Sequence, residues 1–171
     1  SIKITGSSNI DTVNDLLVAG VETINIESDD TATSAANRVH EIALGADSAT
    51  SITITGDSGL VFSTGGHTDI ADVTSMDASG VVLDKVTRTG ITYAATYNTA
   101  SSTTTIKGSN GVDTLTGGAL TNDNITAGSG ADSRPICSKC KCEPRFSSTC
   151  GVRNQATGRQ RGSKFYDLVT H

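Results

Sequence analysis

Three aspartates in a glycine-rich stretch are the side chains whose type and spacing best fit a chemical role. Asp113, Asp123 and Asp132 each end a turn rich in glycine and polar residues, and Leu115 and Ile125 follow the first two aspartates by two places. Glycine permits backbone conformations that let carbonyl oxygens converge, and a carboxylate adds a hard oxygen of the kind that Ca²⁺ prefers. The stretch therefore predicts calcium-binding turns separated by short strands.

The spacing follows the nonapeptide pattern G-G-x-G-x-D-x-U-x, in which U is a large apolar residue. Residues 108–116 match every fixed position except the second glycine, which is Ser109. Residues 117–126 carry one extra residue before the aspartate, and a third copy begins at Ala127 without its first glycine. Plain turns that join strands without a metal are the alternative. The candidate calcium ligands, through side chains or backbone carbonyls, are Gly108, Asn110, Gly111, Asp113, Asp123, Gly128, Gly130 and Asp132.

The other polar residues form no catalytic pattern. The chain has neither His-Glu-x-x-His nor Gly-x-Ser-x-Gly, the motifs of zinc proteases and serine hydrolases. His67 with Asp69 and Asp72 is either a metal or acid–base cluster or a polar turn, and we favour the turn. Asp29 and Asp30 indicate a solvated loop, or at most an additional calcium site. We therefore expect no enzymatic activity.

The segments that must position these turns read as short β-strands. Ile-Lys-Ile-Thr-Gly at 2–6, Ile-Thr-Ile-Thr-Gly at 52–56 and Thr-Thr-Ile-Lys-Gly at 104–108 are variants of one alternating unit. Similar strands separated by small-residue turns favour an all-β solenoid, with a β-sandwich as the alternative. Further strands are predicted at 22–27, 42–44, 60–62, 81–83 and 91–97.

One short N-terminal helix is the exception to this pattern. Ile10, Val13, Leu16 and Leu17 fall at helical spacing, and Gly20 follows just past the end. Such spacing with a terminal glycine predicts a helix over roughly residues 10–18.

Composition changes abruptly after the third aspartate. Residues 1–132 carry five Lys or Arg against sixteen Asp or Glu, whereas residues 133–171 carry eight against two. The whole chain is only 35% hydrophobic and lacks Trp, which predicts thin cores. No segment approaches the ~20 apolar residues of a membrane-spanning helix, so we expect no membrane insertion. The basic residues between Arg153 and Lys164 have little aromatic interleaving and no nucleic-acid motif, so no nucleic-acid partner is expected.

The tail contains all the cysteines of the chain, Cys137, Cys140, Cys142 and Cys150. Their spacing is too crowded for a typical zinc ribbon, and disulfide pairing stays open. Since the change of composition falls inside a repeat, our leading interpretation is that residues 133–171 are a non-native or disordered appendage.

Residues 108–132 resemble the repeats-in-toxin (RTX) segments of proteins exported by bacterial type I secretion. The stretches 21–26, 49–56 and 73–80 resemble the β-rich sequence that precedes such repeats in surface-layer (S-layer) proteins and large adhesins. The resemblance implies a solenoid-like domain over 1–107 and a short parallel β-roll over 108–132. A basic, cysteine-containing tail departs from the family, whose export signals are usually acidic or neutral.

The resemblance also implies a function and the arrangement of the ligands. One nonapeptide of an RTX roll makes half a coil, so Asp113 and Asp132 should stack and share Ca²⁺, whereas Asp123 should bind weakly or not at all. The expected function is an extracellular, calcium-stabilised structural module of an S-layer that assembles with itself. Cell-surface lipopolysaccharide is a possible partner of parts outside this chain. The alternatives are an RTX adhesin stalk and the C-terminal fragment of a secreted RTX hydrolase.

Overall fold

The described part of the chain is built from strands and the turns between them. The computed structural model describes residues 1–9, 16–32, 38–63, 70, 72–95, 103–118, 123–133 and the backbone of 141–142, and these residues contain no helix. The strands are β1 (Ile2–Gly6), β2 (Leu16–Leu17), β3 (Thr23–Asp30), β4 (Val39–Ile42), β5 (Leu44–Gly45), β6 (Ser51–Gly56), β7 (Gly59–Phe62), β8 (Ser75–Val81), β9 (Thr89–Ala94), β10 (Thr105–Lys107), β11 (Val112–Thr116), β12 (Asn124–Thr126) and β13 (Lys141–Cys142).

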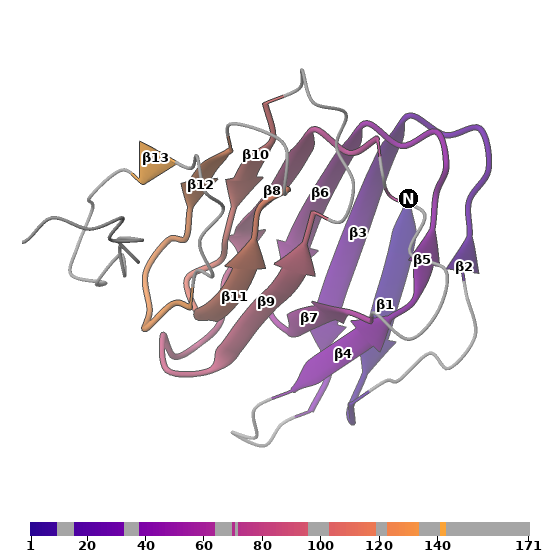
Figure 1. Cartoon of the computed structure of the whole chain (residues 1–171). Coiled ribbons are helices and arrows are strands. Elements are labelled where there is room, and N and C mark those ends of the chain that lie inside the picture. Colours follow the sequence, from indigo (N-terminus) through magenta and orange to yellow (C-terminus); the bar gives the residue numbers. More distant parts are fainter. Residues whose placement is uncertain are drawn as a thin grey trace, which may run out of the picture.

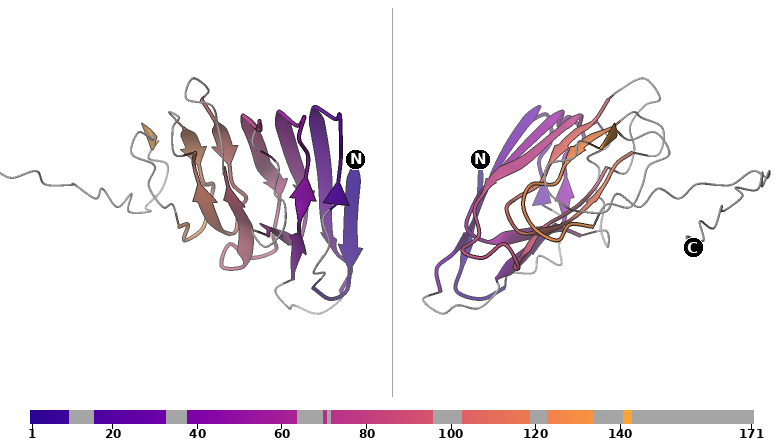
Figure 2. Two further views of the ribbon diagram at one scale, coloured as in Figure 1. Left: turned by 45° about the vertical axis from the view of Figure 1, so that its right-hand side comes forward. Right: turned by 90° about the vertical axis from the view of Figure 1, so that its left-hand side faces the viewer.

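The chain winds as a parallel β-solenoid (Figure 1). From β6 to β12, successive strands alternate between a first sheet, in the order β1-β3-β6-β8-β10-β12-β13, and a second sheet, in the order β11-β9-β7-β4. Every recorded strand pair is parallel. Figure 2 shows β1 at one end of this stack and the repeat coils towards the other. The solenoid prediction is confirmed over the sandwich, whose sheets are antiparallel.

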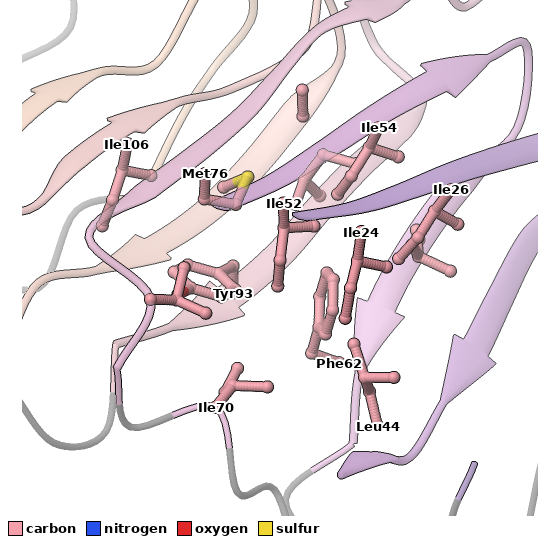
Figure 3. Close-up of a cluster of buried hydrophobic side chains, with 14 of the residues drawn as sticks. Ile24, Ile26, Leu44, Ile52, Ile54, Phe62, Ile70, Met76, Tyr93 and Ile106 are labelled. Atoms are coloured by element: carbon pink, nitrogen blue, oxygen red, sulfur yellow. The ribbon is translucent and has the colours of Figure 1, made fainter. Parts of the chain in front are cut away.

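Ladders of like residues fill the space between the two sheets. In the first sheet, Ile52 is in register with Ile24 and Met76, and Met76 with Ile106; all four are buried, and Figure 3 shows them in a row. Because alternate residues of a strand face opposite sides, each strand contributes only one or two such residues. A parallel stack repeats them at every coil, which produces a continuous core from a polar sequence.

The coils become shorter where the repeats begin. In the second sheet, Leu60 and its register partner Ile91 are separated by a long stretch of chain. Thr114 and Ser133, which form a parallel β-bridge, are separated by a much shorter one. Two nonapeptides plus the one inserted residue account for the shorter coil. The repeat therefore sets the size of its own coil.

The predicted N-terminal helix is wrong at its C-terminal end. Leu16 and Leu17 form the short strand β2, which pairs with β5. The backbone N–H groups of Leu16 and Val18 donate to the carbonyls of Ala43 and Gly45, both at 2.8 Å. Pairing with the next coil thus satisfies the backbone groups that a helix would have bonded internally. Residues 10–15 lie outside the described residues.

The strand predicted at 81–83 is also misplaced. The strand is Ser75–Val81, in which Met76 and Ala78 are buried by alternation, and Val82 beyond it is 62% exposed. The prediction followed the apolar run Val81 to Leu83, of which only Val81 belongs to the strand.

Two segments mark the C-terminal end of the described stack. Ser133 still belongs to the second sheet through its bridge to Thr114, and the backbone of Lys141–Cys142 pairs with β12. The remainder of the tail, with Cys137, Cys140 and Cys150, lies outside the described residues. Within the part of the chain that the structure describes, no helix has the length and apolarity to cross a membrane.

Candidate metal centre

The first and third repeats lie on the same side of the solenoid, one coil apart. The N–H of Ser133 donates to the carbonyl of Asp113 at 2.7 Å. Asp132 reaches back to the same residue, since its Oδ1 accepts the N–H of Asp113 at 3.1 Å. The predicted stacking of Asp113 and Asp132 is confirmed, and a calcium ion shared between them stays a prediction.

Three donors hold the carboxylate of Asp113, which is fully buried. Its Oδ1 accepts the N–H of Ile91 at 2.6 Å and the hydroxyl of Ser109 at 2.8 Å, and its Oδ2 accepts the N–H of Ser109 at 2.9 Å. The Ser109 oxygen in turn accepts the N–H of Gly111 at 3.0 Å. Asp113 therefore ties its own turn to the preceding coil. Ser109 was not a candidate from the sequence, although its place at the one mismatched position of the repeat was a signal.

The electrostatics of Asp113 favour a nearby cation. The pKa of Asp113 is raised from 3.8 to about 6, chiefly by burial and in smaller part by the negative charge of Asp132. The hydrogen bonds from Ile91 and Ser109 act in the opposite direction, and among the described residues no positive side chain shifts this pKa. A cation beside the two carboxylates would offset both burial and repulsion.

The third repeat needs glycine for its backbone conformation. Gly128 and Gly130 have φ angles of 89° and 137°, which residues with a Cβ rarely adopt. A Cβ at Gly128 would overlap the carbonyl oxygen of Ser109, and one at Gly130 would overlap that of Gly111. Carbonyl oxygens of the first turn therefore face the third turn directly.

The first repeat needs glycine for close approach and not for its backbone conformation. Neither Gly108 nor Gly111 has a positive φ angle. A Cβ at Gly108 would overlap the carboxylate of Asp113 and lie 2.5 Å from the carbonyl oxygen of Ala127. A Cβ at Gly111 would overlap the side chain of Leu83. Glycine was expected in these turns because it permits unusual backbone conformations, but at Gly108 and Gly111 the requirement is for space.

The side chain of Asn110 is occupied by a structural contact. Its Nδ2 donates to the carbonyl of Leu83 at 2.9 Å and its Oδ1 accepts the N–H of Leu83 at 2.7 Å. The amide thus pairs with the backbone as a neighbouring strand would. Any contribution of Asn110 to a metal would come from its backbone carbonyl.

Asp123 lies apart from the other two aspartates. It directly precedes β12 of the first sheet, whereas Asp113 belongs to β11 of the second sheet. Asp123 is 2% exposed, and a Cβ at Gly117 would overlap its carboxylate. The predicted separation of the second repeat from the other two is confirmed.

The remaining candidate acids do not form a further metal group within the described residues. Asp29 receives the ammonium of Lys3 at 3.0 Å, and Asp30 lies 3.8 Å from Arg38, so cations of the chain already face both carboxylates. Asp72 is exposed, and His67 and Asp69 lie outside the described residues.

The oxygens between the first and third turns fit Ca²⁺ in kind. Two carboxylates, of Asp113 and Asp132, accompany carbonyls of Ser109, Gly111 and Ala127, and hard oxygen ligands suit calcium. No three His, Cys, Asp or Glu side chains of the described residues form a metal-binding group. A bound ion would therefore take most of its ligands from the backbone, as the glycine-rich turns allow.

In comparisons with known proteins, no protein-family model matches the chain, and no curated protein is significantly similar to it.

Proposed function

We propose that this chain is a calcium-stabilised structural module of a bacterial S-layer, exported by type I secretion, that assembles with copies of itself outside the cell. The stacking of Asp113 on Asp132, one coil apart in a parallel solenoid, is the observation that carries the proposal. It supports a calcium role because a buried and a half-buried carboxylate lie in two stacked turns whose glycines face backbone carbonyls, and the two negative charges repel each other.

The composition supports an extracellular scaffold. The sixteen Asp or Glu of residues 1–132 greatly outnumber the five Lys or Arg, and acidic turns repel one another until a cation bridges them. Extracellular calcium can supply that cation after export, so that folding follows secretion.

Electron microscopy of the purified chain on a lipid monolayer tests this function. We expect ordered two-dimensional arrays with millimolar calcium and none with chelator, and Asp113→Ala should abolish the arrays at calcium concentrations that support the wild type. Asp72→Ala is the matched control, because Asp72 is exposed and outside the repeat. Arrays that form equally well in chelator, or no arrays under any calcium concentration, would contradict the proposal.

A further inference from the structure

Ser109 carries a hydroxyl at a position where the other two repeats have glycine. The second place of the nonapeptide is Ser109 in the first copy, Gly118 in the second and Gly128 in the third. Ser109 is 2% exposed, and its hydroxyl donates to Oδ1 of Asp113 at 2.8 Å while it accepts the N–H of Gly111 at 3.0 Å. The hydroxyl is therefore held on both sides within one turn, with its hydrogen directed at the carboxylate.

The three donors to Asp113 differ in how easily they can be replaced. An ionised carboxylate has about four lone-pair positions, and the donors from the described residues fill three of them at Asp113. Two of these donors are backbone N–H groups, of Ile91 and of Ser109 itself, whose positions the backbone of the coils fixes. The third is the hydroxyl, which rotation about one side-chain bond moves away. The hydroxyl of Ser109 is therefore the donor that a cation can most easily replace.

The preceding coil encloses this hydroxyl and carboxylate. A Cβ at Gly90 would overlap both the Oγ of Ser109 and the Oδ1 of Asp113, so the backbone of β9 lies directly against the pair. A buried ionised group that loses its partners costs much free energy, and a hydrogen bond to an ionised group is stronger than one between neutral groups. The hydroxyl therefore matters most to the fold when no cation is near Asp113.

We propose that the hydroxyl of Ser109 substitutes for calcium at Asp113. It keeps the first turn closed when no ion is bound and, because it competes for the same carboxylate, it lowers the calcium affinity of the site. The inference rests on the proposed function, since it concerns the calcium site assigned there to Asp113 and Asp132. An interaction that stabilises only the ion-free state weakens the apparent affinity for the ion. Ser109 thereby sets the calcium concentration at which the ion begins to stabilise the module.

Ser109→Ala tests the proposal, because it removes the hydroxyl and keeps the backbone N–H. Compared with the wild type, its melting temperature should be about 5 °C lower in chelator and within about 2 °C in saturating calcium. Isothermal titration should show that calcium binds this variant about tenfold more tightly than the wild type. Ser79→Ala is the matched control, since the Oγ of Ser79 donates to Asp77 at 2.6 Å in a solvent-exposed contact. Its loss should be small and equal with and without calcium.

An unchanged melting temperature of Ser109→Ala in chelator, or a calcium affinity no tighter than that of the wild type, would overturn the inference. Should the variant be unfolded in chelator, calcium must restore its fold, and a variant that stays unfolded in calcium would overturn the inference as well. Failure of the proposed function has a different sign, namely a wild-type melting temperature that calcium leaves unchanged. A loss in chelator would then still show that the hydroxyl closes the turn without an ion.

Discussion

Asp113 both fastens two coils together and lies close to a second negative charge. Its carboxylate accepts hydrogen bonds from Ile91 and Ser109, which fasten one coil to the next, and it is exposed to the negative charge of Asp132. The hydrogen bonds partly stabilise the ionised form, and burial opposes it. The Asp113 side chain therefore stabilises the fold and also makes its stability depend on pH and on cations.

The raised pKa of Asp113 predicts how stability changes with pH in chelator. The native-state pKa of about 6 lies above the ordinary 3.8, so the stability that the protonated group contributes is complete below about pH 3.8 and is lost as the pH rises through 6. Relative to Asp113→Asn, the wild type should lose up to about 3 kcal/mol of unfolding free energy between pH 4 and pH 7. Denaturant titrations of both proteins measure this, and parallel pH profiles would refute it.

The two complete repeats should differ in their contribution to calcium binding. Asp113 stacks on Asp132, whereas Asp123 lies on the other side, so Asp113→Ala should weaken calcium affinity about tenfold or more beyond the effect of Asp123→Ala, because the number of charged ligands tunes such sites. Isothermal titration of both variants measures the difference. Equal losses would exclude the assignment of the ion to the first and third turns.

At the scale of the strand, one inward side chain per coil does most of the packing. Ile52 is fully buried and in register with Ile24 and Met76, while its neighbour Thr53 points to the outer face. The outer faces of these strands are polar, and an ion pair of 2.7 Å between Lys107 and Asp77 joins β10 to β8. Inward ladders therefore stabilise the stack, and outward ones keep its surface hydrated.

This division predicts unequal costs for two adjacent truncations. Ile52→Ala leaves a cavity in a fully packed row and should lower the unfolding free energy by about 2–5 kcal/mol. Thr53→Ala, on the same strand, should cost less than about 1 kcal/mol. Chemical denaturation in calcium measures both, and similar costs would mean that the core is not continuous at this coil.

At the scale of the whole molecule, charge and calcium are coupled. The chain is strongly acidic over its β-rich part, 1–132, and the described residues of the short repeat coils contribute fewer buried apolar side chains than those of the coils before them. Saturating calcium should therefore raise the melting temperature by roughly 5–10 °C. Chelation should increase amide exchange mainly in residues 103–133.

Differential scanning calorimetry with and without chelator measures the first effect, and exchange mapped by mass spectrometry measures the second. Magnesium at the same concentration is the control, since its smaller, stricter coordination suits flexible carbonyl turns poorly. Identical melting in calcium and in chelator would contradict the calcium proposal for the molecule as a whole.

The sequence by itself determined the class of fold. Near-identical strands such as 52–56 and 104–108 predicted a solenoid, an inference that depends on local alternation, which neighbouring residues encode directly. The stacking of Asp113 on Asp132 was predicted from the resemblance of the nonapeptides to RTX repeats. Residues within a few positions of one another suffice to state which side of a strand is buried.

Tertiary structure decided which groups complete each turn. Leu16 and Leu17 form a strand because they pair with β5 of a later segment, where the carbonyls of Ala43 and Gly45 accept the N–H groups of Leu16 and Val18. The donors on Asp113 likewise include Ile91 of the preceding coil. In a parallel solenoid every strand is bonded to the coil before and after it. The length of the coil changes along the stack. The stacking of coils therefore brings together residues whose pairing no local spacing in the sequence can specify.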